Sequence, residues 1–502
     1  MTEDENSEIV LKPLVFRVDE NTPELVKNVL LERGWNKYNE DVQDVADWNL
    51  YWRTSAFRMI DHSNVKPWQR LNHHPGTTRL TRKDYLARHL KHMKGIYGAS
   101  LYAFSPLTFI MPKDYIKFVA EYSREKEALG TKPSYWICKP AELSRGRGIM
   151  IFSDLKDLIF DCATIVQKYI TNPFLIARYK CDLRIYVCVA GFQPLTIYLY
   201  QEGLVRFATE KFDLNNLKND CSHLTNSSVN KTGASYKKNK EGVGRGCKWT
   251  LSKFFAYLRS QDVDDLLLWQ RINHLLFGFD ILIDDKFKPW LLEVNFSPGL
   301  SLDCSTDVSV KRKLIHDIIE LMHFNQTRLR KTKKESLCET SNTVHGSSRY
   351  TSHNKETCIS SNIFSLFQGK AYSNDLIALQ KKVKDFPKEI STEKLREKKA
   401  SKDSVPPAFP KIRNRQTTFK SFHLFPSSES CKKKKNITPY FLSDKGMRPC
   451  SHVGDFALIF PFNEATLEAT KNGLDLKKVI HELQKLVNKK STTEAEDKTK
   501  KT

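Results

Sequence analysis

Residues 277–295 read Phe277-Gly-Phe-Asp-Ile-Leu-Ile-Asp-Asp-Lys-Phe-Lys-Pro-Trp-Leu-Leu-Glu-Val-Asn295, and this stretch decides the fold. Two apolar runs flank Asp284-Asp285-Lys286, a combination that is typical of the turn of a β-hairpin. The sequence therefore predicts a two-stranded ribbon that carries a few polar groups on an otherwise apolar surface.

Pairing Ile283 with Trp290 across this turn places Asp280 opposite Glu293, and Asn295 lies two positions further on the same face. Oxygen ligands of this kind suit Mg²⁺, which commonly takes one or two carboxylates together with substrate phosphates. The alternative is a partly buried polar face that lysines neutralise. Two directly opposed carboxylates repel each other unless a cation separates them, and this favours the metal.

A second candidate hairpin lies upstream. Trp136-Ile-Cys-Lys-Pro predicts a strand that ends near Lys139, Ile149-Met-Ile-Phe predicts its partner, and Ser144-Arg-Gly-Arg-Gly forms the tip. Glycine N–H groups can approach phosphate closely, and Arg145 and Arg147 add positive charge. The tip is neither a Walker loop nor a dinucleotide fingerprint. By itself this signal is weak, and it favours an ordinary exposed basic turn over a phosphate site.

Lys180, Asp182 and Arg184 alternate along a predicted strand and therefore share one face. A buried row of this kind needs either mutual salt bridges or a ligand, and the sequence leaves both open. On the predicted strand 166–170, Gln167 and Tyr169 could serve the edge and face of a nucleobase, but taken alone they favour packing.

Two further polar clusters are Arg206-Phe-Ala-Thr-Glu-Lys and His223-Leu-Thr-Asn-Ser-Ser-Val-Asn-Lys. The second could equally be a capped turn, because Asn and Ser favour turns. No Gly-x-Ser-x-Gly or Cys-His elbow is present, which argues against hydrolase chemistry.

The composition limits the class of protein. The chain has 502 residues with 40% hydrophobic residues, so disorder of the whole chain is excluded. Its eleven cysteines are scattered without zinc spacing, as expected for reduced thiols in the cytoplasm. Charged and polar residues break the longest apolar run, Leu266 to Ile283, and the first residues are acidic, so we expect neither a membrane span nor a secretory signal.

The chain divides by composition into five parts. We predict a flexible N-terminus over 1–12, a globular α/β or α+β region over 13–330, and a mostly disordered basic segment over 331–450. A short strand and an amphipathic helix then occupy 451–490, with the strand beginning at Phe456 and the helix spanning 476–487, and a flexible tail covers 491–502. Within the globular region we predict a strand over 14–18, a helix over 23–33 capped by Thr22, and a basic helix over 80–93.

The net charge of +23 is concentrated in residues 331–450, which hold 25 lysines and arginines against 11 aspartates and glutamates. Such a segment attracts nucleic acid, anionic lipid or an acidic protein surface, and charge alone does not choose among them. Few aromatic residues lie between these lysines, and no nucleic-acid-binding module is visible, so we expect neither nucleic acid nor membrane as the partner.

Taken together, the motifs resemble the tubulin tyrosine ligase-like family, and most of all its polyglutamylase branch. Six segments are similar to motifs of that family and appear in the same order: Trp136-Ile-Cys-Lys-Pro, Ser144-Arg-Gly-Arg-Gly-Ile, Val166-Gln-Lys-Tyr-Ile, Asp182-Leu-Arg-Ile-Tyr-Val, His223-Leu-Thr-Asn and Pro289-Trp-Leu-Leu-Glu-Val-Asn-Phe-Ser-Pro. The resemblance covers roughly residues 13–330.

The resemblance implies an ATP-grasp fold, in which a small N-terminal α/β domain precedes two lobes that clasp ATP. It also implies an ATP- and Mg²⁺-dependent ligase that activates a carboxylate as an acylphosphate and joins glutamate to acidic tubulin tails. By resemblance, the ATP contacts are Lys139, Arg145, Gly146, Gln167, Lys168, Tyr169, Ile170, Lys180, Asp182, Thr225 and Asn226, with Lys83 as a further candidate. Arg184 would stabilise phosphoryl transfer, together with Lys139 and Glu293 as catalytic groups.

The same resemblance implies that Asp280, Glu293 and Asn295 hold Mg²⁺. It assigns the incoming glutamate to Arg206, Ser228, Lys248, Asn295 and Lys311. Three positions depart from the pattern of the family: Ser227 replaces a tyrosine, Cys181 a phenylalanine and Phe296 a small residue. We therefore expect a missing aromatic wall, a cysteine that faces away from ATP, and a tightened pocket beside Asn295.

The resemblance leads us to expect a monomer that acts on tubulin and microtubules through their acidic C-terminal tails, with free L-glutamate as co-substrate. We expect it in the cytoplasm on the cytoskeleton, with the cilium or basal body as a further location. The alternatives are a glycine ligase, a glutamate ligase for acidic tails of other proteins, and a non-catalytic microtubule-binding protein.

Overall fold

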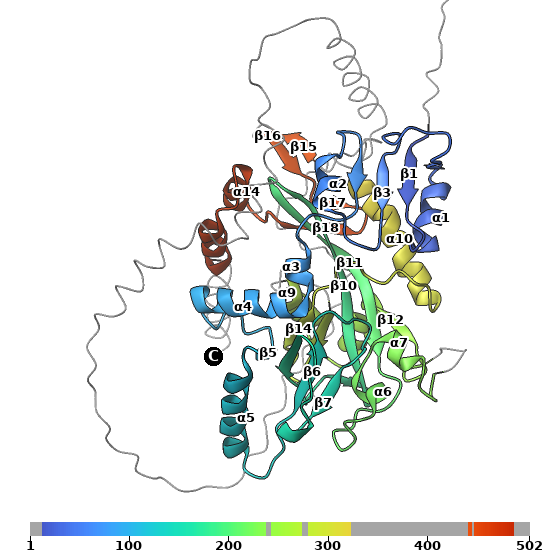
Figure 1. The fold of residues 1–502 in the computed structure, drawn as a ribbon. Coiled ribbons are helices and arrows are strands. Elements are labelled where there is room, and N and C mark those ends of the chain that lie inside the picture. Colours follow the sequence, from blue (N-terminus) through green and yellow to red (C-terminus); the bar gives the residue numbers. More distant parts are fainter. Residues whose placement is uncertain (1–12, 237–241, 274–279, 323–439, 444–445, 486–502) are drawn as a thin grey trace, which may run out of the picture. The chain divides into compact units, whose positions relative to one another are not determined.

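The computed structural model describes residues 13–236, 242–273, 280–322, 440–443 and 446–485 (Figure 1). These residues form a mixed α/β structure with four β-sheets, which confirms the predicted class. The predicted flexible ends at 1–12 and 491–502, and residues 323–439 of the basic segment, lie outside the described residues, so disorder there stays a prediction.

The first sheet is entirely parallel and has the order β2-β1-β3-β4. Its strands are β1 (Val15–Val18), β2 (Asn36–Lys37), β3 (Leu50–Trp52) and β4 (Arg70–Leu71). Helix α1 (Glu24–Glu32) packs on it because Val26, Val29 and Leu30 fall on one helical face and are buried against Phe16. The predicted strand and helix are both confirmed.

The predicted capping residue of α1 is wrong. The helix begins after Pro23, which holds the N-cap position without a side-chain hydrogen bond. The Thr22 hydroxyl instead hydrogen-bonds the Asp19 carboxylate and the Trp52 carbonyl oxygen, at 2.7 and 3.2 Å. Thr22 therefore ties the turn before α1 to the end of β3.

The basic helix predicted over 80–93 is in fact two helices. Helix α3 (Thr78–Thr81) and helix α4 (Lys83–Tyr97) are separated by Arg82, whose backbone is extended with ψ at 129°. Helix α2 (Met59–Ser63) precedes them. Figure 1 shows α4 beside the second sheet, and among its described residues only Asp84 is buried.

The second sheet is antiparallel and has the order β5-β8-β6-β7. Its strands are β5 (Thr108–Met111), β6 (Trp136–Pro140), β7 (Met150–Phe152) and β8 (Thr164–Lys168). Helix α5 (Tyr115–Leu129) buries Phe118 and Tyr122 against Trp136. The predicted hairpin with the Ser144–Gly148 tip is confirmed as β6 and β7.

The largest sheet has the order β14-β13-β10-β11-β18-β17, with β9 beside β10 and β12 beside β11. The strands are β9 (Leu175–Ile176), β10 (Tyr179–Phe192), β11 (Leu195–Phe207), β12 (Lys248–Thr250), β13 (Asp280–Ile283), β14 (Pro289–Glu293), β17 (His452–Val453) and β18 (Phe456–Phe460). The short helices α6 (Asp220–His223) and α7 (Ser227–Asn230) lie between β11 and β12 in the chain.

The two faces of this sheet pack against different helices. Leu183 and Ile185 of β10 are buried with α8 (Leu251–Ser260), whose neighbour in the chain is α9 (Asp265–Asn273). Tyr186 lies in a separate cluster with α10 (Ser305–Met322). Lys180, Asp182 and Arg184 alternate in step with Tyr186 along β10. They therefore lie on the face of the sheet opposite α8, as the alternation predicts. Helix α10 also contacts the first sheet through Ile315 and Ile319.

The C-terminal part returns to the core. Strand β18 pairs with β11, and the backbone N–H of Asp455 donates to Asp317 of α10 at 3.0 Å. The predicted strand from Phe456 is confirmed, and residues 476–485 are helical, while 486 and 487 lie outside the described residues. Helix α14 (Glu464–Lys471) and the hairpin β15 (Tyr440–Ser443) with β16 (Gly446–Pro449) are additional elements, the latter at the end of the basic segment.

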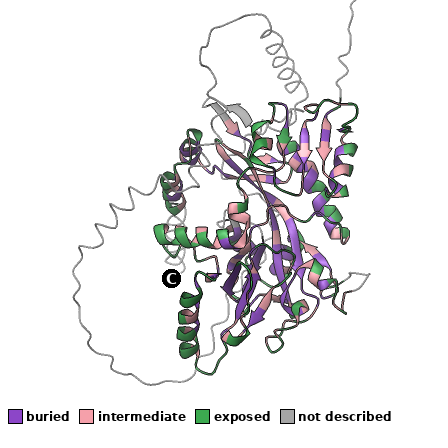
Figure 2. Cartoon of the chain, viewed as in Figure 1, coloured by how far each residue is buried: buried purple, intermediate pink, exposed green. Residues whose placement is uncertain are grey.

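Burial separates the core from the surface in Figure 2, where the central strands are buried and α4 is largely exposed. None of the helices among the described residues combines the length and the apolarity that a membrane crossing requires.

Candidate active site

A cleft lies between the second sheet and the largest sheet. Its walls come from β6 and β8 on one side, from β10, β13 and β14 on the other, and from the tip of the β6–β7 hairpin. The two sheets therefore bring together segments that are more than one hundred residues apart in the sequence.

Most of the predicted site residues line this cleft. They are Lys83, Lys139, Arg145, Gly146, Gln167, Lys168, Tyr169, Ile170, Lys180, Asp182, Arg206, Thr225, Asn226, Asp280 and Glu293. The predicted residues that do not line it are Arg184, Ser228, Lys248, Asn295 and Lys311. The lining is rich in cations and also contains three carboxylates, as expected for a site that binds phosphate groups.

The carboxylate hairpin forms as predicted in its main feature, because Asp280 of β13 pairs with Glu293 of β14. The predicted partner of Ile283 is wrong by one residue, since Ile283 pairs with Pro289. A register shift between Asp280 and Ile281 compensates for this difference. A bulge of this kind can turn a side chain toward a site, and here it keeps the two carboxylates opposed.

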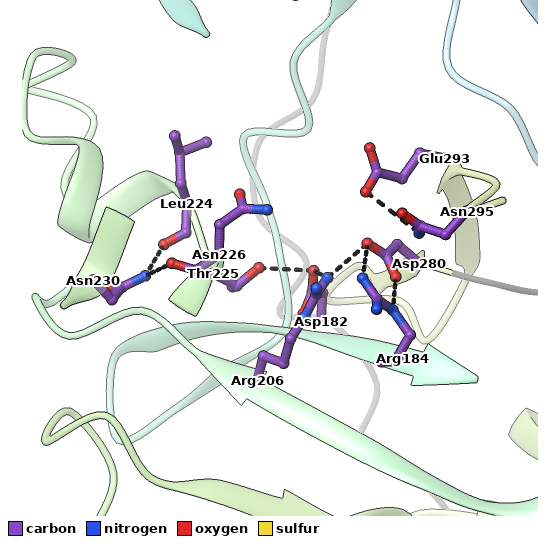
Figure 3. Close-up of polar contacts among 10 residues, drawn as sticks. All are labelled: Asp182, Arg184, Arg206, Leu224, Thr225, Asn226, Asn230, Asp280, Glu293 and Asn295. Atoms are coloured by element: carbon purple, nitrogen blue, oxygen red, sulfur yellow. Dashed lines mark hydrogen bonds and ion pairs between the residues drawn. The ribbon is translucent and has the colours of Figure 1, made fainter. Parts of the chain in front are cut away.

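Two arginines bind Asp280 from neighbouring strands (Figure 3). Arg184 donates from Nε and Nη2 to the two carboxylate oxygens, the second at 3.0 Å, and Arg206 Nη2 donates to Oδ2 at 2.8 Å. Burial disfavours ionisation of Asp280, but the two guanidinium groups outweigh this effect and hold its pKa well below the usual range. Asp280 is therefore a fixed negative charge in the cleft.

Arg206 also binds Asp182, with Nε donating to Oδ1 at 2.8 Å, and Thr225 donates its hydroxyl to Oδ2 at 2.7 Å (Figure 3). Asp182 and Arg184 are thus paired with Arg206 and Asp280 and not with each other, so the predicted mutual salt bridges are wrong. Lys180 and Asp182 line the cleft, and ligand binding by this row stays a prediction. Arg206 and Asp182 are each at most 9% exposed. The network is a buried structural unit as well as a polar wall.

Glu293 is the less compensated carboxylate. Burial and the neighbouring Asp280 raise its pKa, and its hydrogen-bonding partner Asn295 Nδ2 lies 3.5 Å from Oε1. A carboxylate whose ionisation is opposed by burial and by a second carboxylate is a suitable ligand for a cation. Asp280, Glu293 and Asn295 supply carboxylate and amide oxygens, which are the hard donors that Mg²⁺ prefers, so the residues present fit this metal.

Two buried lysines face the same space. Lys139 Nζ donates to Gln167 Oε1 at 2.9 Å, and Lys180 Nζ donates to the Tyr169 hydroxyl at 3.0 Å. Burial lowers the pKa of Lys139 to about 8, although Glu293 opposes the shift. Burial and the nearby Lys139 lower the pKa of Lys180 to about 7. A bound polyphosphate would stabilise the protonated form of both.

We therefore expect nucleotide affinity to fall as the pH rises from 7 to 9. The free protein loses protons from Lys180 and then from Lys139 across this range, and phosphate binding has to restore them. Each group can contribute up to about one log unit of affinity per pH unit. Titration of a fluorescent ATP analogue at several pH values measures the slope. The double substitution Lys139→Arg with Lys180→Arg is the control, because arginine stays charged, and an equal slope in both proteins contradicts the assignment.

The tip of the β6–β7 hairpin is fixed against α7. Gly146 has φ at +83°, and a Cβ placed on it would lie 2.5 Å from Val229 Cγ2 and 3.3 Å from Asn226 Oδ1. Ser228 donates its hydroxyl to the carbonyl oxygen of Arg145 at 2.7 Å. The resemblance assigns Ser228 to glutamate binding, but in this structure its hydroxyl holds the hairpin tip.

Gly146→Ala is expected to raise the KM for ATP by roughly tenfold. The left-handed backbone costs an alanine about 1–2 kcal/mol, and the contact with Val229 forces the tip away from the cleft. Steady-state kinetics with varied ATP measures the change. Gly95→Ala is the matched control, since Gly95 lies within helix α4 and a Cβ added there would meet no heavy atom within 4 Å. Equal KM values for the two variants would contradict a nucleotide-binding role of the tip.

Lys248 and Lys311 converge on Asp307 of α10. Their ammonium groups lie 2.7 and 2.8 Å from its two carboxylate oxygens, and Lys248 also contacts Asp303 at 3.2 Å. Lys248 lines a second, smaller hollow together with Arg206 and Ser227. Arg206 lines the cleft and Lys248 lines the smaller hollow, but each cation predicted to grip glutamate is paired with a carboxylate of the chain.

The three departures from the family pattern have different outcomes. Cys181 is buried in the α8 core and faces away from the cleft, as predicted. Phe296 does not line the cleft, and its ring stacks on His73 with 4.0 Å between the ring centroids, so a tightened pocket beside Asn295 stays a prediction. Ser227 shares the smaller hollow with Tyr236, which supplies an aromatic ring near the place where one was expected to be missing.

Sequence reasoning missed the apolar part of the cleft and one of its supports. The residues that form this apolar part are Pro106, Ile149, Leu282 and Leu292. Only Leu282 could have been predicted to line the cleft, since it lies two residues from Asp280 on the same strand face.

The support that was missed is Asn230. Its side chain accepts from Thr209 and donates to the carbonyl groups of Leu224 and Asn226 at 2.7 and 3.0 Å (Figure 3). Asn230 therefore holds the segment that carries Thr225 and Asn226.

Comparison with known proteins identifies relatives of the chain. The profile of the tubulin-tyrosine ligase family matches residues 60–276 and 270–332. A human protein named probable tubulin polyglutamylase TTLL2 (Homo sapiens) is 57% identical over 97% of this chain and 87% of its own length. The mouse tubulin polyglutamylase TTLL5 (Mus musculus) is 32% identical over 64% of this chain and 26% of its own length. The human tubulin monoglutamylase TTLL4 is 34% identical over 62% of this chain and 28% of its own length.

The motifs that predicted the family lie within these matched residues, and five of the site residues they predicted form one hydrogen-bonded network across three strands and one loop. The identity to TTLL2 extends beyond the catalytic region to nearly the whole chain. The chain therefore belongs to the tubulin-tyrosine ligase family.

Proposed function

We propose that this protein is an ATP- and Mg²⁺-dependent ligase of the ATP-grasp type that adds glutamate to glutamate side chains in acidic tubulin C-terminal tails. The observation that carries the proposal is the cleft in which Lys139 and Lys180 face the Asp280–Glu293 pair. The relatives named tubulin polyglutamylase and monoglutamylase support the same substrate. In this proposal the enzyme works in the cytoplasm at the cytoskeleton, with the cilium or basal body as a further location.

The residues divide the work of binding. Gln167, Tyr169 and the apolar wall formed by Ile149 and Leu282 provide a slot for the nucleobase. Lys139, Lys180 and the Gly146 tip would bind the phosphates, and Asp280, Glu293 and Asn295 would hold Mg²⁺. The metal, when bound, neutralises charge on the transferring phosphoryl group. Positioning and electrostatics carry most of the catalysis in such transfers.

The proposed reaction passes through an acylphosphate, because a free carboxylate is a poor electrophile. The γ-phosphoryl group of ATP moves to a tail carboxylate, ADP leaves, and the amino group of glutamate then attacks the acyl carbon and displaces phosphate. Arg184 donates to both oxygens of Asp280, which lines the cleft, although Arg184 itself does not line it. Its role in stabilising phosphoryl transfer stays a prediction.

Glycine ligation is the second candidate, and one observation favours it. Arg206, Lys248 and Lys311 are all paired with carboxylates of the chain, so the site offers fewer uncompensated cations for a second substrate carboxylate than predicted. Glutamate binding would require these pairs to share their cations, whereas glycine would not. The names of the relatives favour glutamate.

Competition between labelled glutamate and labelled glycine tests the proposal on the unmodified protein with ATP, Mg²⁺ and microtubules. We expect glutamate to be incorporated at least tenfold faster, because a site that hydrogen-bonds a carboxylate discriminates against an analogue that lacks it. Preferential incorporation of glycine would replace the glutamate assignment. Incorporation of neither amino acid, in a protein that binds ATP, would leave only a nucleotide-binding member of the family.

A further inference from the structure

Helix α4 is unusual among the long helices of this protein because it is hardly packed. Only Asp84 of its fifteen residues is buried, and no α4 residue belongs to a hydrophobic core cluster of the described chain. Figure 2 shows that most of its surface is exposed. Core packing therefore does not explain the exposed face of this helix.

The charge of that face is one-sided. Arg88, Lys91 and Lys94 are exposed, and no acidic side chain among the described residues forms an ion pair with Arg88 or Lys94. Helix α5 has the same length but balances Lys117, Arg124 and Lys126 with three glutamates, and Arg124 pairs with Glu121. An excess of unpaired cations on one helix is a surface for an anionic partner.

The helix begins at the mouth of the cleft. Lys83 lines the cleft and donates its ammonium to the Leu143 carbonyl oxygen at 2.6 Å, and Arg82 pairs with Glu142 at 2.6 Å. Both contacts are made to the hairpin that carries Gly146. Tyr85 then lies between Arg82 and Arg88, whose guanidinium groups are 4.9 and 5.3 Å from its ring. The cationic face thus continues directly from the phosphate-binding tip.

We propose that the exposed face of α4 formed by Arg88, Lys91 and Lys94, which follow one another at three-residue spacing, is a docking surface for the acidic peptide that the enzyme modifies. The inference rests on the proposed function for the identity of that peptide, but its argument is charge complementarity at a fixed position. The basic segment of the chain itself does not suit this face, because both carry positive charge. An extended peptide rich in glutamate, laid along α4, would reach the cleft at Lys83.

The test compares two double variants. One carries Arg88→Gln and Lys94→Gln on α4, and the other carries Lys117→Gln and Lys126→Gln on α5. Both double variants remove two exposed cations and leave the ion pairs of Arg82 and Lys91 intact. Binding of a fluorescein-labelled polyglutamate peptide should weaken by about threefold to tenfold in the α4 variant only, and the difference should shrink at high salt. The KM for tubulin should rise by a similar factor while the KM for ATP stays unchanged.

The two variants separate this inference from the proposed function. Loss of peptide binding in the α4 variant supports the surface even if glutamate incorporation is never detected, and that second result would count against the proposed function alone. Equal peptide affinity in the α4 and α5 variants overturns the docking surface. A single-stranded oligonucleotide that binds the unmodified protein as tightly as the peptide, and loses affinity equally, overturns the assignment to an acidic peptide.

Discussion

Glu293→Gln is expected to lower glutamate incorporation by roughly a hundredfold or more, with the protein still folded. Glu293 faces Asp280 across the β13–β14 hairpin, and the two carboxylates repel each other in the absence of a cation. Glutamine keeps the shape and removes this repulsion, so the thermal midpoint should not fall. The charge that would hold Mg²⁺ is lost at the same time. Incorporation assays over a range of Mg²⁺ concentrations, beside thermal denaturation, measure both effects.

Asp285→Asn is the matched control for this substitution. Asp285 lies in the turn of the same hairpin, is exposed, and accepts a hydrogen bond from Asn172 at 2.6 Å. It should change incorporation by less than about twofold, as exposed positions usually do. A folded Glu293→Gln protein with full activity would refute the metal site, whatever the control shows.

Arg206→Ala is expected to destabilise the protein by about 3–5 kcal/mol, because it leaves two buried carboxylates without their shared cation. Arg206 donates to Asp182 and to Asp280, so its removal affects the nucleotide wall as well as the amino-acid side of the cleft. The sequence alone predicts a selective loss of glutamate binding. The structure instead predicts a joint loss of stability and of ATP affinity.

A double-substitution cycle tests this prediction. Adding Asp182→Asn to Arg206→Ala removes one of the stranded charges, so the pair should recover part of the lost stability. Urea denaturation at equilibrium measures the free energy of unfolding of each variant. Strictly additive effects of the two substitutions, or an Arg206→Ala protein of unchanged stability, would show that this ion-pair network contributes nothing to the fold.

Much of the site was predictable because its signals are local. Alternating polar residues at 180, 182 and 184, the opposed Asp280 and Glu293, and the glycine tip at 146 each depend on a few neighbouring positions. The family resemblance then ordered these signals into one cleft. The strand and the helix near the C-terminus were also predicted from short-range periodicity, because burying one face of an element leaves a regular pattern.

What could not be predicted depends on distant partners. Nothing near Arg206 in the sequence shows that Asp182 and Asp280 share its guanidinium, and nothing near Ser228 shows that its hydroxyl holds Arg145. The one-residue bulge beside Asp280 arises from pairing along the whole hairpin, so turn chemistry alone gave the wrong partner for Ile283. Helix α14 begins after a capping box at Asn463. This helix lies between the predicted strand and the predicted helix, in a stretch for which we predicted no element.

The pairing of β18 with β11 changes the topology of the cationic segment. The chain leaves the core at the end of α10 and returns before β17, where the Tyr198 hydroxyl binds the Cys450 carbonyl oxygen at 2.9 Å. Residues 323–439 therefore connect two anchored points and are not a free tail. Because the entropic cost of joining two fixed points grows only slowly with the length of the connection, we expect the fold to tolerate insertions and deletions between them.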